Sequence, residues 1–152
     1  MSFAIDVNIL VYASADGAPE RDAAIEFLQS CSRGPEVFYV AWLSLMSYMR
    51  LVTHPKILRN PLSVAQARQN VESLLQLPHC RTLSEQEGFW TVYLECSTGL
   101  QVRGNDVPDT HLAAILKQNG VTRLYTADRD FRRFDFLKVI DPISTAASRG
   151  RR

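Results

Sequence analysis

Short apolar runs alternate with longer amphipathic segments along the first half of the chain. Residues 3–5 and 37–40 are apolar, β-branched or aromatic runs of strand length. Asp6 and Asn8 are both candidate N-caps for the helix that follows the first run. The recurrence of apolar side chains at helical spacing predicts helices over residues 8–15, 19–31 and 42–53.

The second half repeats this alternation. Ser63 is a predicted N-cap, and Ser84 with Glu87 forms a predicted capping box. The pattern predicts helices over residues 63–76, 84–98 and 109–118, and strands over residues 81–83, 121–126 and 138–140. Strands that alternate with helices indicate an α/β fold with a largely parallel sheet. We expect one domain over residues 1–143, followed by a basic, flexible tail at 144–152.

Three or four aspartates are predicted to meet at one edge of this sheet. Asp6 follows the first strand, Asp128 and Asp130 follow the strand that ends near residue 126, and Asp109 begins the preceding helix. Ligand sites in parallel α/β sheets lie outside the carboxyl ends of the strands. Carboxylates gathered there repel unless a cation neutralises them, and Mg²⁺ and Mn²⁺ prefer such oxygen ligands. The alternative interpretation is that these aspartates only cap helices.

The charge balance conceals a segregation of basic and acidic residues. The chain of 152 residues has 17 Lys and Arg against 16 Asp and Glu, a net charge of +1. Residues 45–68 nevertheless carry four bases and no acid, and residues 121–152 carry eight bases and four acids. Fourteen of the bases are Arg, whose planar fork matches phosphate oxygens, so a nucleic-acid partner is not excluded.

The remaining composition predicts a cytoplasmic protein. Cys31, Cys80 and Cys96 are widely spaced without metal-ligand motifs, and we interpret them as reduced core thiols. No export signal opens the sequence, and the longest uncharged stretch, residues 37–49, is too short to span a bilayer.

Four runs carry a family resemblance: IDVNILVYA at 5–13, RLVTHPKI at 50–57, NDVPDTHLAA at 105–114 and YTADRDFRRF at 125–134. Together they resemble PIN-domain ribonucleases, and most of all the VapC-type toxins of bacterial toxin–antitoxin pairs. The resemblance implies a three-layer αβα PIN-like domain with a mainly parallel central sheet. It implies a Mg²⁺-dependent endoribonuclease, with Mn²⁺ as a substitute, that cuts structured RNA such as a tRNA or rRNA loop and inhibits translation. It also implies a type II module, a VapB-type antitoxin as partner, a homodimer and no membrane association.

On matching positions, the resemblance makes Asp6, Asp109 and Asp128 the metal-binding and catalytic carboxylates, with Asp130 close by and Thr126 as a supporting hydroxyl. Many relatives place a Glu where this chain has Ser47. This departure favours one metal ion over two and leaves Asp106 as a candidate replacement. It also keeps open an alternative function, a catalytically weakened PIN-like module that binds RNA or protein. A receiver-like domain is disfavoured because paired acids after the first strand are missing.

Other residues have two interpretations each. Arg50 either contacts phosphate or holds the carboxylates together through ion pairs. His111 is either a proton shuttle or a helix-surface side chain. For Trp42 and Trp90 we favour core packing over base stacking. The three arginines that surround the last aspartates are predicted RNA contacts, namely Arg129, Arg132 and Arg133.

Overall fold

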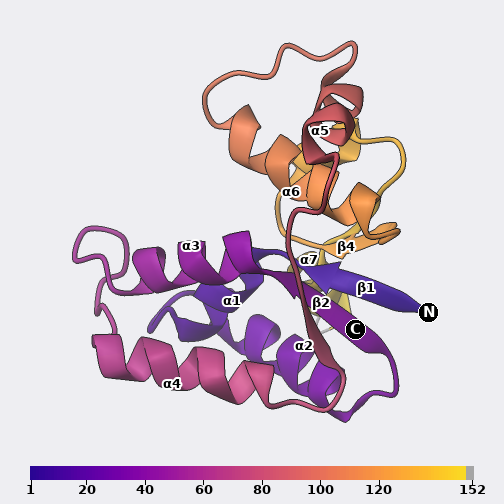
Figure 1. Cartoon of the computed structure of the whole chain (residues 1–152). Helices are drawn as coiled ribbons and strands as arrows, with labels where there is room; N and C mark the ends of the chain where they lie inside the picture. The colour runs from indigo at the N-terminus through magenta and orange to yellow at the C-terminus, as the bar shows by residue number, and fades with distance from the viewer. Residues whose placement is uncertain (150–152) are drawn as a thin grey trace.

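The computed structural model describes residues 1–149 (Figure 1). Its first half contains β1 (Ser2–Ile5), α1 (Val7–Ser14), α2 (Arg21–Arg33), β2 (Val37–Ala41), α3 (Trp42–Val52) and α4 (Val64–Leu75). Its second half contains β3 (Cys80–Leu83), α5 (Phe89–Ser97), α6 (Asp106–Gln118), β4 (Arg123–Tyr125), the 3₁₀ helix η1 (Arg129–Arg133), β5 (Lys138–Ile140) and α7 (Pro142–Arg149).

The five strands form one sheet in the order β3-β2-β1-β4-β5, and every neighbouring pair is parallel. The predicted parallel α/β fold is therefore confirmed. In the centre, Ala4 of β1 lies opposite Tyr39 of β2 on one side and Leu124 of β4 on the other. The carboxyl ends of β1 and β4 consequently lie side by side, although about 120 residues separate them in the sequence.

Helices cover both faces of the sheet, giving three layers (Figure 1). Phe3 and Ile5 pack into a core with α1 to α4, whereas Ala4, between them, packs into a second core with α5 and α6. This alternation follows from the two-residue period of a strand. Both faces of the central strands are buried, which explains why the strands read as continuous apolar runs.

The C-terminal segment differs from the prediction. Residues that were expected to begin a flexible tail at 144 instead belong to α7, which packs against α2. The Asp141 side chain accepts hydrogen bonds from the backbone N–H groups of Ile143 and Ser144, which stabilises the start of this helix. Residues 150–152 of the predicted tail lie outside the described residues.

The start of α5 also differs from the prediction. Ser63 caps α4 through a reciprocal capping box with Gln66, as its position predicts. Ser84, by contrast, does not start a helix, because the following segment is bound to the end of α6. The Gln86 N–H donates to Gln118 Oε1 at 2.9 Å, and Gln86 Nε2 donates to Asn119 Oδ1 at 2.7 Å. The chain turns at Gly88, with φ 79°, and α5 begins only afterwards.

The three cysteines are buried free thiols, which confirms their interpretation as core residues. Burial raises the pKa of the Cys31 thiol to about 12 and that of Cys80 to about 11. Because the thiolate is the reactive form, these groups are inert at neutral pH. Among residues 1–149, no helix is both long enough and apolar enough to cross a membrane.

The two serines give a matched test of helix capping. We expect Ser63→Ala to lower the free energy of unfolding by about 1 kcal/mol, because it removes the side chain that caps α4. Ser84→Ala, at the predicted cap that forms no capping box, should change it by less than about 0.5 kcal/mol. Urea denaturation measures both values, and equal effects of the two substitutions would contradict the assigned helix starts.

Candidate active site

Three elements bring the predicted aspartates together at the carboxyl edge of the sheet. Asp6 follows β1 and caps α1. Asp109 lies in the first turn of α6. Asp128 caps η1 just after β4, and its carboxylate accepts the Asp130 N–H at 2.9 Å. The local role of Asp6 and Asp128 as caps thus coexists with their convergence at one site.

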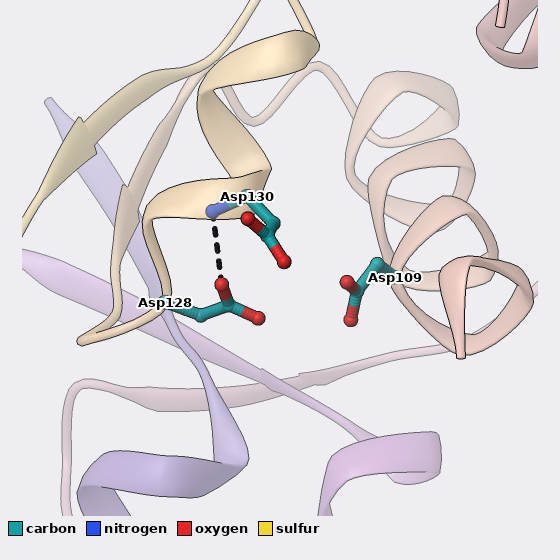
Figure 2. A group of neighbouring side chains, drawn as sticks. All are labelled: Asp109, Asp128 and Asp130. Atoms are coloured by element: carbon teal, nitrogen blue, oxygen red, sulfur yellow. Dashed lines mark hydrogen bonds between the residues drawn. The ribbon is translucent and has the colours of Figure 1, made fainter.

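Asp109, Asp128 and Asp130 form the acid triad, a group in which each residue offers a carboxylate oxygen within 4.8 Å of the other two. Figure 2 shows the three carboxylates turned toward one shared space, Asp109 from α6 and the other two from the start of η1. Asp130, which sequence matching placed only in a supporting role, is therefore a full member of this group.

Asp6 is not a member of the triad and is only 6% exposed. Its Oδ1 accepts the Val7 N–H at 2.7 Å, and its Oδ2 accepts bonds from Thr126 Oγ1 at 2.8 Å and Asn8 Nδ2 at 3.3 Å. These bonds fix the Asp6 carboxylate. The buried hydroxyl of Thr126 also accepts the Asp128 N–H at 3.0 Å, so it links Asp6 to the triad.

Asn8 has a role beyond that of the helix cap that its sequence position suggests. Its side-chain amide donates to Thr126 Oγ1 at 3.0 Å, and its Oδ1 accepts the Ala127 N–H at 3.3 Å. Asn8 therefore joins the end of β1 to the segment after β4. The available signal was a second polar side chain two residues after Asp6, directly beyond a buried strand.

Burial and mutual repulsion disfavour the ionised forms of the carboxylates at this site. Burial raises the pKa of Asp6, although the bonds from Thr126 and Val7 oppose this shift. Burial, followed by the charge of Asp128, raises the pKa of Asp109 from 3.8 to about 6. Because folding raises the pKa of Asp109, ionising this carboxyl lowers the stability of the folded protein. This loss of stability begins as the pH rises through 3.8 and is complete above about 6. At neutral pH the site therefore favours a neutralising cation.

The donor set fits a hard divalent cation. The triad offers only carboxylate oxygens, which Mg²⁺ and Mn²⁺ prefer, and no soft ligand such as Cys or His belongs to it. Asp109 and Asp128 are partly buried, while Asp130 is exposed, so one side of the group faces solvent. Asp109, Asp128 and Asp130 are the residues that would hold such an ion. Asp6, which the family resemblance makes a metal-binding carboxylate, is not part of this group, and the Thr126 hydroxyl links it to Asp128.

Asp106 and Arg133 occupy positions that differ from those expected. Asp106 begins α6 and lies outside the triad; its Oδ1 accepts a bond from Arg133 Nη1 at 2.8 Å. Arg133 Nη2 also donates to Asp109 Oδ2 at 3.1 Å. Arg133, a predicted RNA contact, is thus bound to two carboxylates. It fills the role of holding the carboxylates that was considered for Arg50.

The other candidates are more exposed or lie elsewhere. Arg129 and Arg132 are exposed on η1, and Arg50 is exposed on α3. Ser47 lies on the same helix, partly buried. His111 pairs with Glu85 and packs against the Phe89 ring, as a helix-surface side chain does.

The predicted core packing of the two tryptophans is wrong. Trp90 is 66% exposed and Trp42 is 42% exposed. Trp90 stacks on Tyr93 of the same helix, with ring centroids 5.3 Å apart. Helical spacing alone could not show that these side chains face outward.

Comparisons with known proteins agree with this geometry. The family model described as PIN domain matches residues 3–137. The chain is 38% identical to Ribonuclease VapC48 of Mycobacterium tuberculosis over 144 residues, which are 95% of this chain and 99% of that protein. The chain therefore belongs to the PIN-domain family, among its VapC ribonucleases.

Solved structures show the same fold. The VapBC2 structure from Rickettsia felis, bound to a promoter DNA fragment, matches with a TM-score of 0.67 at 18% identity, over 92% of this chain and 98% of that one. VapC20 of Mycobacterium tuberculosis, a toxin that cleaves the sarcin-ricin loop, matches with a TM-score of 0.64 at 16% identity, over 86% and 92% of the two chains.

The Thr126 hydroxyl can be tested by comparison with a second buried threonine. We expect Thr126→Val to lower the free energy of unfolding by about 1–3 kcal/mol, because it leaves the buried Asp6 Oδ2 and the Asp128 N–H short of partners. Thr110 is equally buried, but within residues 1–149 its hydroxyl bonds only the Asp106 carbonyl of its own helix. Thr110→Val should cost less than about 1 kcal/mol in urea denaturation. An equal or larger loss for Thr110→Val would contradict the linking role of Thr126.

Proposed function

We propose that this protein is a Mg²⁺-dependent endoribonuclease toxin of a type II toxin–antitoxin module. Its substrate is a structured RNA, such as a tRNA or rRNA loop, and its cleavage inhibits translation in the cytoplasm. Mn²⁺ can substitute for Mg²⁺, because both ions prefer oxygen ligands.

One observation carries the proposal: the acid triad lies at the carboxyl edge of a parallel sheet in a chain closely similar to a named ribonuclease. Helix capping explains Asp6 and Asp128 one at a time. It does not explain why the carboxylates of Asp109, Asp128 and Asp130 converge from two separate elements. A site that binds a divalent cation supplies that reason.

The side chains divide the work of the site. Asp109, Asp128 and Asp130 would hold the cation, and the charge of the Asp6 carboxylate, which acts on Asp109, would add to the negative charge of the site. Thr126 and Asn8 keep Asp6 and the Asp128 backbone in place. When bound, the metal supplies Lewis-acid activation for phosphodiester hydrolysis. With three triad carboxylates and Ser47 on α3, the site favours one ion over two.

Arginines beside the triad supply contacts for the RNA backbone. Arg129 and Arg132 are exposed on η1, the element that carries Asp128 at its start and includes Asp130. Phosphate contacts from such side chains position nucleic acid without reading its sequence. Arg50 is a third candidate contact, from α3.

The proposed function also includes two protein partners, an antitoxin and a second copy of this chain. We expect a VapB-type antitoxin to bind and inhibit the enzyme, as the family resemblance implies. We also expect a homodimer, and exposed apolar side chains provide surface that a second copy can cover: Trp42 and Met46 on α3, and Trp90 and Leu94 on α5. Light scattering of the purified chain, alone and mixed with antitoxin, measures both associations.

Cleavage of total bacterial RNA by the purified, antitoxin-free protein tests the activity. We expect cleavage with Mg²⁺ or Mn²⁺ and none with a chelator. Asp128→Asn should reduce the rate at least about 100-fold, because it removes a charge from the metal site. Asp135→Asn, an exposed aspartate outside the triad, is the matched control and should keep full activity.

Two results would overturn the nuclease proposal: absence of cleavage with both metals, or equal cleavage by wild type and Asp128→Asn. Binding of RNA without any cleavage would instead favour the binding-module function that Ser47 leaves open.

Charge reversal tests the RNA surface. We expect the double substitution Arg129→Glu and Arg132→Glu to weaken RNA binding. The fall of log affinity with log salt should become less steep by about 1–2, because two phosphate contacts are lost. Reversal of Arg68, an exposed arginine on α4, serves as the control. A slope unchanged by the η1 reversal would show that RNA binds elsewhere.

A further inference from the structure

Arg133 bonds two carboxylates, one that belongs to the acid triad and one that does not. Its Nη1 donates to Asp106 Oδ1 at 2.8 Å, and its Nη2 donates to Asp109 Oδ2 at 3.1 Å. Asp109 is a triad member, whereas Asp106 is not. One guanidinium therefore connects the predicted metal site to a carboxylate outside it.

The geometry of α6 and η1 produces this arrangement. Asp106 and Asp109 are three residues apart in the first turn of α6, so their side chains lie on one face of the helix. Arg133 is the last residue of η1, the element that also bears Asp130. The guanidinium lies over the Phe134 ring, 5.1 Å from its centroid, and the side chain is only 24% exposed. The fork is thus held by two carboxylates and an aromatic face.

A fixed cation beside a metal site has two opposite effects. Its charge repels an incoming metal ion, which lowers affinity. Its hydrogen bond fixes one carboxylate oxygen and thereby orients the ligand, which raises affinity. Here Asp106 makes the shorter bond to Arg133 and offsets much of its charge, while the directional bond to Asp109 remains. This balance favours the orienting effect.

We propose that Asp106 and Arg133 form a positioning pair that orients the Asp109 carboxylate for the divalent cation. Asp106 anchors the guanidinium, and the guanidinium fixes Asp109 Oδ2. Neither residue is a metal ligand. This inference rests on the metal-dependent function proposed above, and it assigns Asp106 a role through Arg133 in place of the ligand role that the sequence suggested.

Mn²⁺ binding to the purified full chain, measured by calorimetry without RNA, tests the pair. Arg133→Gln should weaken Mn²⁺ binding by about 10–100-fold, the usual effect of losing a group that orients a ligand. Simple charge removal predicts the opposite sign, tighter binding, so the direction of the change separates positioning from repulsion. Arg132→Gln removes the same charge from the neighbouring exposed position and should leave affinity within about twofold or raise it slightly.

The anchor is tested by a double-mutant cycle. Asp106→Asn should also weaken Mn²⁺ binding, and the double variant should be no weaker than Arg133→Gln alone, because the two residues act as one unit. Arg133→Lys keeps the charge and the stem on Phe134 but lacks the planar fork, so it should also lose affinity. Thermal unfolding of each metal-free variant confirms that a folded protein is compared.

Unchanged or tighter Mn²⁺ binding by folded Arg133→Gln or Arg133→Lys would overturn the positioning role. Additive losses in the double variant would overturn the anchoring by Asp106. In both cases, RNA cleavage by the wild type would leave the nuclease proposal standing. Failure of the wild type to bind Mn²⁺ would overturn both proposals together.

Discussion

The contact between the ends of β1 and β4 is the constraint on which the site depends. Parallel pairing brings Asp6 and Thr126 together across 120 residues of sequence, and the buried Thr126 hydroxyl donates to Asp6 while it accepts the Asp128 N–H. Asn8 strengthens the same junction from the β1 side. Without this pairing, Asp6 would remain a helix cap and the segment that carries Asp128 and Asp130 would have no fixed position.

The pairing concentrates negative charge, and the fold balances it in two ways. Hydrogen bonds stabilise the Asp6 carboxylate, which is otherwise disfavoured by burial. Arg133 stabilises the carboxylates at the start of α6: its bond lowers the pKa of Asp106, whereas the pKa of Asp109 remains raised. The remaining electrostatic cost therefore falls on Asp109, through its burial and the charge of Asp128, and a divalent cation at the triad would relieve it. The near-neutral net charge of the chain conceals this local excess of acid beside the exposed arginines of η1.

The distribution of exposed side chains follows from the same layered fold. The two faces of the sheet are covered by α1 to α4 and by α5 with α6, so each helix buries one face and exposes another. In the uncharged stretch 37–49, Phe38, Val40 and Leu45 are buried in the core, yet Trp42 and Met46 remain outside. Most of this apolar stretch therefore belongs to the core. Only its exposed side chains, Trp42 and Met46, provide surface that a partner can contact.

The sequence by itself determined the alternation of strands and helices, the parallel sheet and the edge at which the aspartates gather, because these depend on local periodicity and on the general geometry of βαβ units. It also determined the Ser63 cap, since that motif closes within four residues. Only the tertiary structure decided where α5 starts, because contacts of Gln86 with Gln118 and Asn119 keep the preceding segment out of the helix. It also decided that α7 packs on α2. It likewise decided that Arg133 faces carboxylates, that Asp130 completes the triad and that Trp90 faces outward. Each of these outcomes depends on which side chains from distant segments occupy the same space, and the hydrophobic pattern of a single segment carries no information about that.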